Sequence, residues 1–120
     1  MLIVEDEPNI VLSLEILLQR AGYATVSTGD GEEALELIRR TRPDVVLLDI
    51  MLPKRNGYEV CRFVKSDPLL SSIPVIMLTA KGQEVEILKG QELGASAYIA
   101  KPFGNAEVLE VVRAALESRA

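Results

Sequence analysis

The chain has 120 residues, of which 48% are hydrophobic and 26% are charged, and its formal net charge is −5. This composition is typical of one compact domain with a substantial core, and it argues against disorder. The acidic balance disfavours direct binding to nucleic acid or to an anionic membrane surface.

Features that the chain lacks further limit where the protein is expected to be located and which side chains can carry its chemistry. No apolar stretch approaches the roughly 20 residues that a membrane helix needs, and no signal peptide is visible. A single cysteine, Cys61, excludes an internal disulfide and suits a reducing compartment, so we expect a cytoplasmic protein. The lack of histidine excludes histidine metal sites and serine–histidine–aspartate triads, which leaves carboxylates, lysines and hydroxyls to carry any chemistry.

Short apolar runs alternate with longer segments whose apolar residues recur at helical spacing. The runs predict buried strands at residues 1–4, 24–27, 45–48, 75–78 and 97–100. The periodic segments predict helices at residues 8–21, after Asp30, at 58–65 behind Asn56, at 83–93, and after Asn105. Asp30 and Asn105 are the predicted caps of their helices, and Gly90 weakens the helix at 83–93 by about 1 kcal/mol relative to alanine.

Strands that are apolar on both faces and alternate with helices indicate an α/β fold whose parallel sheet is covered on both sides. Right-handed crossovers leave few topologies, and the common doubly wound order for five strands is 2-1-3-4-5. We therefore predict a doubly wound (βα)5 fold, with helices on both faces of the sheet, as a single domain over residues 1–120.

Polar residues follow four of the predicted strands. Glu5 and Asp6 follow the first strand, Asp49 the third, Thr79 the fourth and Lys101 the fifth. The carboxyl ends of parallel strands meet at one edge of the sheet, and ligands bind there at the point where the strand order reverses. In the order 2-1-3-4-5 that point lies between the first and third strands, which carry the acids. Each residue alone is typical of a turn, a cap or solvated surface, but the shared edge predicts a functional site.

Carboxylates gathered at one point repel each other by about 4 kcal/mol per pair at ~4 Å and an effective dielectric constant near ~20. Either one acid is protonated or a cation lies among them, and oxygen ligands select a hard ion such as Mg²⁺. A divalent ion, the Lys101 ammonium and the Thr79 hydroxyl together form a cradle for a phosphoryl group. Asp49 is then the predicted acceptor, because a carboxylate can form an acyl phosphate.

From end to end the chain resembles the receiver domain of two-component response regulators, which has a flavodoxin-like fold. The resemblance rests on LIVEDEP (residues 2–8), PDVVLLDIMLPKRNGYEV (43–60), PVIMLTAK (74–81) and LGASAYIAKPF (93–103), whose order and spacing are specific together. It implies that a sensor histidine kinase or a phosphotransfer protein phosphorylates Asp49, and that small phosphodonors can substitute. The chain would then catalyse its own phosphorylation and dephosphorylation without being an enzyme in the usual sense.

The resemblance also implies a role for each residue at the predicted edge. Asp6 and Asp49 are implied to ligate Mg²⁺ (or Mn²⁺), with Glu5 acting through water and the backbone carbonyl of Met51 as a further ligand. Thr79 and Lys101 are implied to bind the phosphoryl oxygens.

A second group of residues is implied to shape the site or to carry the signal away from it. Tyr98 would turn inward when Thr79 moves towards the phosphate, which would change the surface formed by the fourth helix, the fifth strand and the last helix. Pro53 and Gly57 would shape the loop after the phosphorylated strand. The Lys101–Pro102 peptide bond is expected to be cis.

Three other functions share parts of this pattern. A flavodoxin-like FMN carrier needs a hydroxyl-rich phosphate loop after the first strand, where this chain has the acidic EDEPN (residues 5–9). An aspartyl phosphatase of the D-x-D type needs a second aspartate two residues after Asp49, where Met51 stands. A receiver-like interaction module that no longer accepts phosphate is the remaining alternative, although every chemical position is filled.

The downstream effector is not identified by the sequence, and we expect no direct contact of this domain with nucleic acid or membrane. Many DNA-binding relatives form symmetric dimers through aspartates and arginines, at positions where this chain has Ser96, Ala97, Ala106 and Val111. We therefore expect a monomer while Asp49 is unphosphorylated.

Overall fold

The computed structural model describes residues 1–52, 56–80 and 94–118. Its five strands form one parallel sheet in the order β2-β1-β3-β4-β5, which confirms the predicted topology. The strands are β1 (Leu2–Val4), β2 (Val26–Thr28), β3 (Val46–Asp49), β4 (Val75–Ala80) and β5 (Ala97–Lys101).

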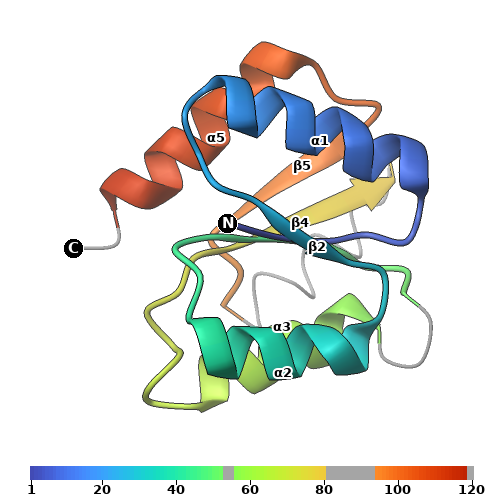
Figure 1. Ribbon diagram of the computed structural model, residues 1–120. Helices are drawn as coiled ribbons and strands as arrows, with labels where there is room; N and C mark the ends of the chain where they lie inside the picture. The colour runs from blue at the N-terminus through green and yellow to red at the C-terminus, as the bar shows by residue number, and fades with distance from the viewer. Residues whose placement is uncertain (53–55, 81–93, 119–120) are drawn as a thin grey trace.

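Helices cover both faces of this sheet, as predicted. The described helices are α1 (Pro8–Arg20), α2 (Gly31–Thr41), α3 (Gly57–Ser66) and α5 (Asn105–Glu117). Figure 1 shows α1 and α5 together on one face and α2 and α3 on the other. The helix predicted at residues 83–93 lies outside the described residues.

Consecutive strand residues point to opposite faces and fill two separate cores. Leu47 and Ile76 pack on the face that α1 and α5 cover, whereas Leu48 and Met77 pack on the face that α2 and α3 cover. All four are fully buried, which explains why the strands are unbroken apolar runs in the sequence. Among the described helices, none is long and apolar enough to span a membrane.

The strands that carry site residues extend beyond the predicted ends. Asp49 is the last residue of β3 and pairs in register with Leu78, and Lys101 is the last residue of β5 and pairs with Ala80. The predicted ends were placed at the last apolar residue, but the backbone ladder does not depend on side-chain polarity. Both charged residues are therefore held by the sheet rather than by loops.

Of the two predicted helix caps, Asp30 is confirmed and Asn105 is wrong, and Asn56, in front of the helix predicted at 58–65, also acts as a cap. The carboxylate of Asp30 accepts a hydrogen bond from the Glu32 N–H at 2.8 Å, and the Asn56 side chain accepts one from the Glu59 N–H at 3.0 Å. Asn105 is not a cap but the first residue of α5, because the extended backbone before the helix belongs to Gly104. Glycine is acceptable at this position because it satisfies the extended dihedrals without strain.

Candidate functional site

Three acidic side chains meet at the carboxyl edge of the sheet. Glu5 and Asp6 follow β1, Asp49 ends β3, and one carboxylate oxygen of each lies within 4.8 Å of the others. Glu5 is 2% exposed and Asp49 is 5% exposed, whereas Asp6 is open to solvent. The predicted clustering is thus present in the fold, at the point where the strand order reverses between β1 and β3.

Lys101 brings a positive charge to this cluster from the end of β5. Its Nζ lies 2.7 Å from Glu5 Oε1 and 3.3 Å from Asp49 Oδ2. The shorter contact is to Glu5, so Lys101 is held mainly by the acid that was not predicted to accept the phosphoryl group. One ammonium cannot neutralise three carboxylates, and the cluster keeps a net negative charge when all three are ionised.

Backbone N–H groups orient the two buried acids. The Glu7 N–H donates to Glu5 Oε2 at 3.2 Å, and the Met51 N–H donates to Asp49 Oδ1 at 3.2 Å. Each buried carboxylate therefore has one oxygen on a backbone donor and the other towards Lys101. This arrangement fixes the rotation of both carboxylates.

The ionisable groups of the site shift one another's pKa values. Burial raises the pKa of Glu5, and the nearby Asp49 carboxylate raises it further, which together outweigh the lowering effects of Lys101 and of the Glu7 N–H. The pKa of Lys101 is also raised: burial lowers it, but Glu5 and Asp49 more than compensate.

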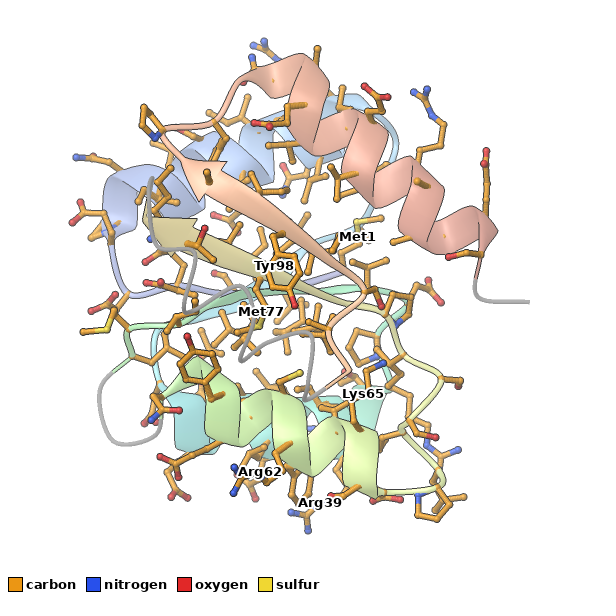
Figure 2. All side chains as sticks on the ribbon, turned by 180° about the vertical axis from the view of Figure 1, so that it is seen from behind. Met1, Arg39, Arg62, Lys65, Met77 and Tyr98 are labelled. Atoms are coloured by element: carbon orange, nitrogen blue, oxygen red, sulfur yellow. The ribbon has the colours of Figure 1, made fainter. Side chains whose placement is uncertain are left out.

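Thr79 and Tyr98, the two residues predicted to move, carry hydroxyl groups that lack hydrogen-bond partners among the described residues. Thr79 is 2% exposed in β4, beside β3 and β5. Tyr98 projects from β5 on the side of the sheet where α3 lies, and it packs on the same core as Met77 (Figure 2). Burial raises the pKa of Tyr98 to about 12, with smaller contributions from Cys61 and Tyr58.

The remaining predicted residues lie around the rim or outside the described ranges. The Met51 side chain is 73% exposed, although its backbone is tied to Asp49. The Lys101–Pro102 peptide bond is cis, as predicted. Pro53 lies outside the described residues.

Gly57 supports the backbone of the predicted acceptor. Its N–H donates to the Ile50 carbonyl at 2.8 Å, and a Cβ at this position would lie 2.4 Å from the Asp49 carbonyl oxygen and 2.8 Å from Ile50 Cα. Only glycine allows the first turn of α3 to approach the end of β3 this closely.

A second glycine, Gly29, follows β2 and lies close to the backbone of Asp6. The sequence analysis did not identify it as part of the site. A Cβ built on Gly29 would lie 3.2 Å from Asp6 Cα and 3.4 Å from Asp6 Cβ, so the loop after β2 packs directly against the exposed acid. Its position after a strand, at the same sheet edge as the acids, was a signal that could have identified it.

The donor set fits a hard divalent cation. All the candidate side-chain ligands are carboxylate oxygens, they converge within 4.8 Å, and a lysine alone leaves the cluster negatively charged. Oxygen-only ligands of this kind suit Mg²⁺, which keeps several waters when it binds to a few carboxylates. The exposed Asp6 leaves the cluster open to solvent on one side.

Comparisons with known proteins agree on one family. The sequence model described as "Response regulator receiver domain" matches residues 1–113. The chain is 45% identical over 115 residues to the DNA-binding response regulator MtrA of Mycobacterium tuberculosis strain H37Rv, covering 96% of this chain and 49% of MtrA. The chain therefore spans about half the length of this relative.

Solved structures show the same fold. The receiver domain of the sensor histidine kinase PA1611 from Pseudomonas aeruginosa PAO1, with a magnesium ion coordinated in its active site cleft, aligns with a TM-score of 0.90 and 31% identity, covering 98% of this chain and 96% of that one. The phosphorylated cyanobacterial phytochrome response regulator RcpA aligns with a TM-score of 0.84 and 30% identity, covering 99% and 94%.

A Gly57→Ala substitution should lower the free energy of unfolding by about 1–3 kcal/mol, because the added methyl group must displace the backbone of Asp49 and Ile50. Urea denaturation followed by circular dichroism measures this. Gly104→Ala is the matched control, since a Cβ there meets no atom within 4 Å, and its effect should stay within about 1 kcal/mol. Equal losses in both variants would contradict the assigned packing role.

The raised pKa of Glu5 should make stability depend on pH in the metal-free protein. The folded state binds this proton more tightly than the unfolded state, so the contribution of Glu5 is fully present below its ordinary pKa of 4.5 and is lost as pH rises through the raised value. Compared with Glu5→Gln, the unmodified protein should therefore lose stability as the pH rises above 4.5. Urea titrations with a chelator present measure this, and parallel curves for the two proteins would contradict it.

Proposed function

Because the chain belongs to the response regulator receiver domain family, we propose that Asp49 accepts a phosphoryl group from a sensor histidine kinase or a phosphotransfer protein. A receiver domain of this kind is the part of a two-component system that receives the signal rather than a conventional enzyme. In the proposed step an Asp49 carboxylate oxygen attacks the phosphorus of the donor. The new O–P bond replaces the P–N bond of a phosphohistidine, whose ring nitrogen leaves with the electron pair.

The observation that carries the proposal is the pairing of one buried carboxylate with a lysine at an open, acidic sheet edge. Asp49 Oδ1 is held by the Met51 N–H, and Asp49 Oδ2 lies 3.3 Å from Lys101 Nζ. An ammonium in this position can move from a carboxylate to a phosphoryl oxygen without leaving the site. This geometry supports Lys101 as the residue that stabilises charge on the transferred group.

We further propose that Asp6 and Asp49 hold Mg²⁺, or Mn²⁺ in its place, with the Met51 carbonyl as a third protein ligand and Glu5 acting through water. When bound, the ion supplies positive charge that offsets the charge of the nucleophile and of the phosphoryl oxygens. The convergence of the three carboxylates supports this assignment, as does the magnesium ion coordinated in the active site cleft of the similar PA1611 receiver domain.

The signal is proposed to travel through Thr79 and Tyr98. A phosphoryl group on Asp49 adds about one negative charge and new acceptor oxygens, to which the Thr79 hydroxyl can donate. Both hydroxyls lack partners among the described residues, which is consistent with side chains that form their hydrogen bonds in another state. Movement of Tyr98 would then change the surface around β5 and α5, together with the helix predicted at residues 83–93.

We also propose partners, a location and an oligomeric state for the protein. MtrA is described as DNA-binding and is about twice the length of this chain, so we propose that an effector, as a further domain or as a separate protein, receives the signal. We propose that this domain itself touches neither nucleic acid nor membrane, works in the cytoplasm, and is monomeric while Asp49 is unphosphorylated. The replacement of dimer-forming charges by Ser96, Ala97, Ala106 and Val111 supports the last of these.

Acetyl phosphate with Mg²⁺ should add one phosphoryl group to Asp49, as measured by mass spectrometry of the intact protein and of its peptides. Asp49→Asn should abolish the addition, because an amide oxygen is too weak a nucleophile to form the acyl phosphate. Asp44→Asn is the matched control, since Asp44 precedes β3 at the opposite edge of the sheet, and it should be labelled normally. A folded protein that takes up no phosphoryl group would favour the inert interaction module.

Asp6→Asn should weaken Mg²⁺ binding about tenfold or more, because it removes one of the charged ligands. Isothermal titration calorimetry measures the affinity. Glu7→Gln removes the neighbouring exposed acid, which is outside the cluster, and should change the affinity far less. Equal losses in the two variants would mean that general acidity, rather than ligation by Asp6, attracts the ion.

A further inference from the structure

Met51 stands out among the large apolar side chains of the described residues because it is both the most exposed and chemically oxidisable. Its side chain is 73% exposed, compared with 68% for Leu69 and 56% for Leu12. A side chain this exposed contributes little burial energy, so converting its thioether to a polar sulfoxide should leave the fold intact.

The other sulfur atoms of the chain are better protected. Met77 lies in β4 with no exposed surface and packs on the core between the sheet and α2 and α3 (Figure 2), and Met1 is half-buried against the other core. Cys61 is fully buried, and burial raises the pKa of its thiol, which disfavours the reactive thiolate. An oxidant in solution would therefore meet Met51 before it meets any of these residues.

The position of Met51 links its side chain to the chemistry of the site. It lies two residues after Asp49, and its own N–H donates to Asp49 Oδ1 at 3.2 Å. The backbone is therefore fixed against the acceptor carboxylate, and an exposed side chain starts from this fixed backbone. A sulfoxide oxygen on this side chain would accept hydrogen bonds from water and hold water near Asp49.

We propose that Met51 is a site of reversible oxidation by hydroperoxides, and that its sulfoxide shortens the lifetime of the phosphoryl group on Asp49. The sulfur lone pair attacks one peroxide oxygen, an S–O bond forms and the O–O bond breaks. The sulfur loses two electrons to the breaking O–O bond. The proton of the attacked oxygen passes to the leaving oxygen, which departs as water from hydrogen peroxide or as an alcohol from an organic hydroperoxide. The effect on lifetime rests on the proposed phosphorylation of Asp49, whereas the selectivity of the oxidation does not.

Hydrogen peroxide applied to the folded protein, followed by peptide mass spectrometry, tests the selectivity. Met51 should gain one oxygen atom well before Met77 does, and Cys61 should remain reduced. Unfolding in urea should make Met77 as reactive as Met51, since burial alone protects it. Faster oxidation of Met77 or Cys61 than of Met51 in the folded protein would overturn the assignment.

The regulatory effect is tested by the rate at which the protein, after labelling with acetyl phosphate and Mg²⁺, loses its phosphoryl group. Oxidation should shorten the lifetime by about twofold or more, and methionine sulfoxide reductase should restore it. Met51→Leu, which cannot be oxidised at this position, should have the same lifetime before and after peroxide, and Met51→Gln, which carries a polar oxygen, should resemble the oxidised protein.

The outcomes separate this inference from the proposed function. Unchanged lifetimes for the oxidised protein and for Met51→Gln would overturn the regulatory effect while leaving phosphorylation of Asp49 in place. If the protein with unoxidised Met51 takes up no phosphoryl group, the proposed function is contradicted. The regulatory effect is then contradicted as well, because it depends on that function. The peptide map would still decide whether Met51 is the preferred site of oxidation.

Discussion

The concentration of negative charge at one edge of the sheet is the constraint on which the rest of the site depends. Glu5 and Asp49 are almost fully buried, and removing a carboxylate from water is costly unless it is paired and hydrogen-bonded. Each has one backbone N–H and a share of a single ammonium, that of Lys101. This compensation is incomplete once Asp6 is included. Burial, with a smaller contribution from the neighbouring Asp49 carboxylate, raises the pKa of Glu5. A divalent cation is the simplest way to supply the missing charge.

The residues of the site differ in whether their polar groups have partners in the described part of the chain. Asp49 and Lys101 belong to the backbone ladder of the sheet, and Gly57 locks the first turn of α3 against the end of β3. Thr79 and Tyr98 are also on strands, but their buried hydroxyls lack partners in the described part of the chain. An unsatisfied buried polar group costs roughly 1–3 kcal/mol, so a state that gives these hydroxyls partners would recover some of that energy. This difference is consistent with the proposed roles of Asp49 and Lys101 in phosphoryl transfer and of Thr79 and Tyr98 in the switch.

The sequence by itself determined the fold class, the strand order and which residues gather at the acidic edge of the sheet. Alternating apolar runs and amphipathic segments were enough to predict a doubly wound parallel sheet, because burial of strands on both faces leaves a clear pattern in the residues. The carboxyl ends of those strands then selected Glu5, Asp6, Asp49 and Lys101, since all parallel strands end at the same edge. The wrong cap at Asn105 lies at an element end, where a polar residue fits the cap and the first turn equally well.

Only the tertiary structure decided which neighbours these residues contact and which of them are buried. Lys101 lies closer to Glu5 than to Asp49, Glu5 rather than Asp6 is buried, and Gly29 packs against Asp6. It also showed that Met51 is fixed by its backbone to Asp49 while its side chain is exposed. The physical reason is that pairing, burial and close approach depend on distances between segments far apart in the chain, set to within tenths of an ångström by packing. A sequence pattern records which edge a residue occupies, but not which neighbour it touches there.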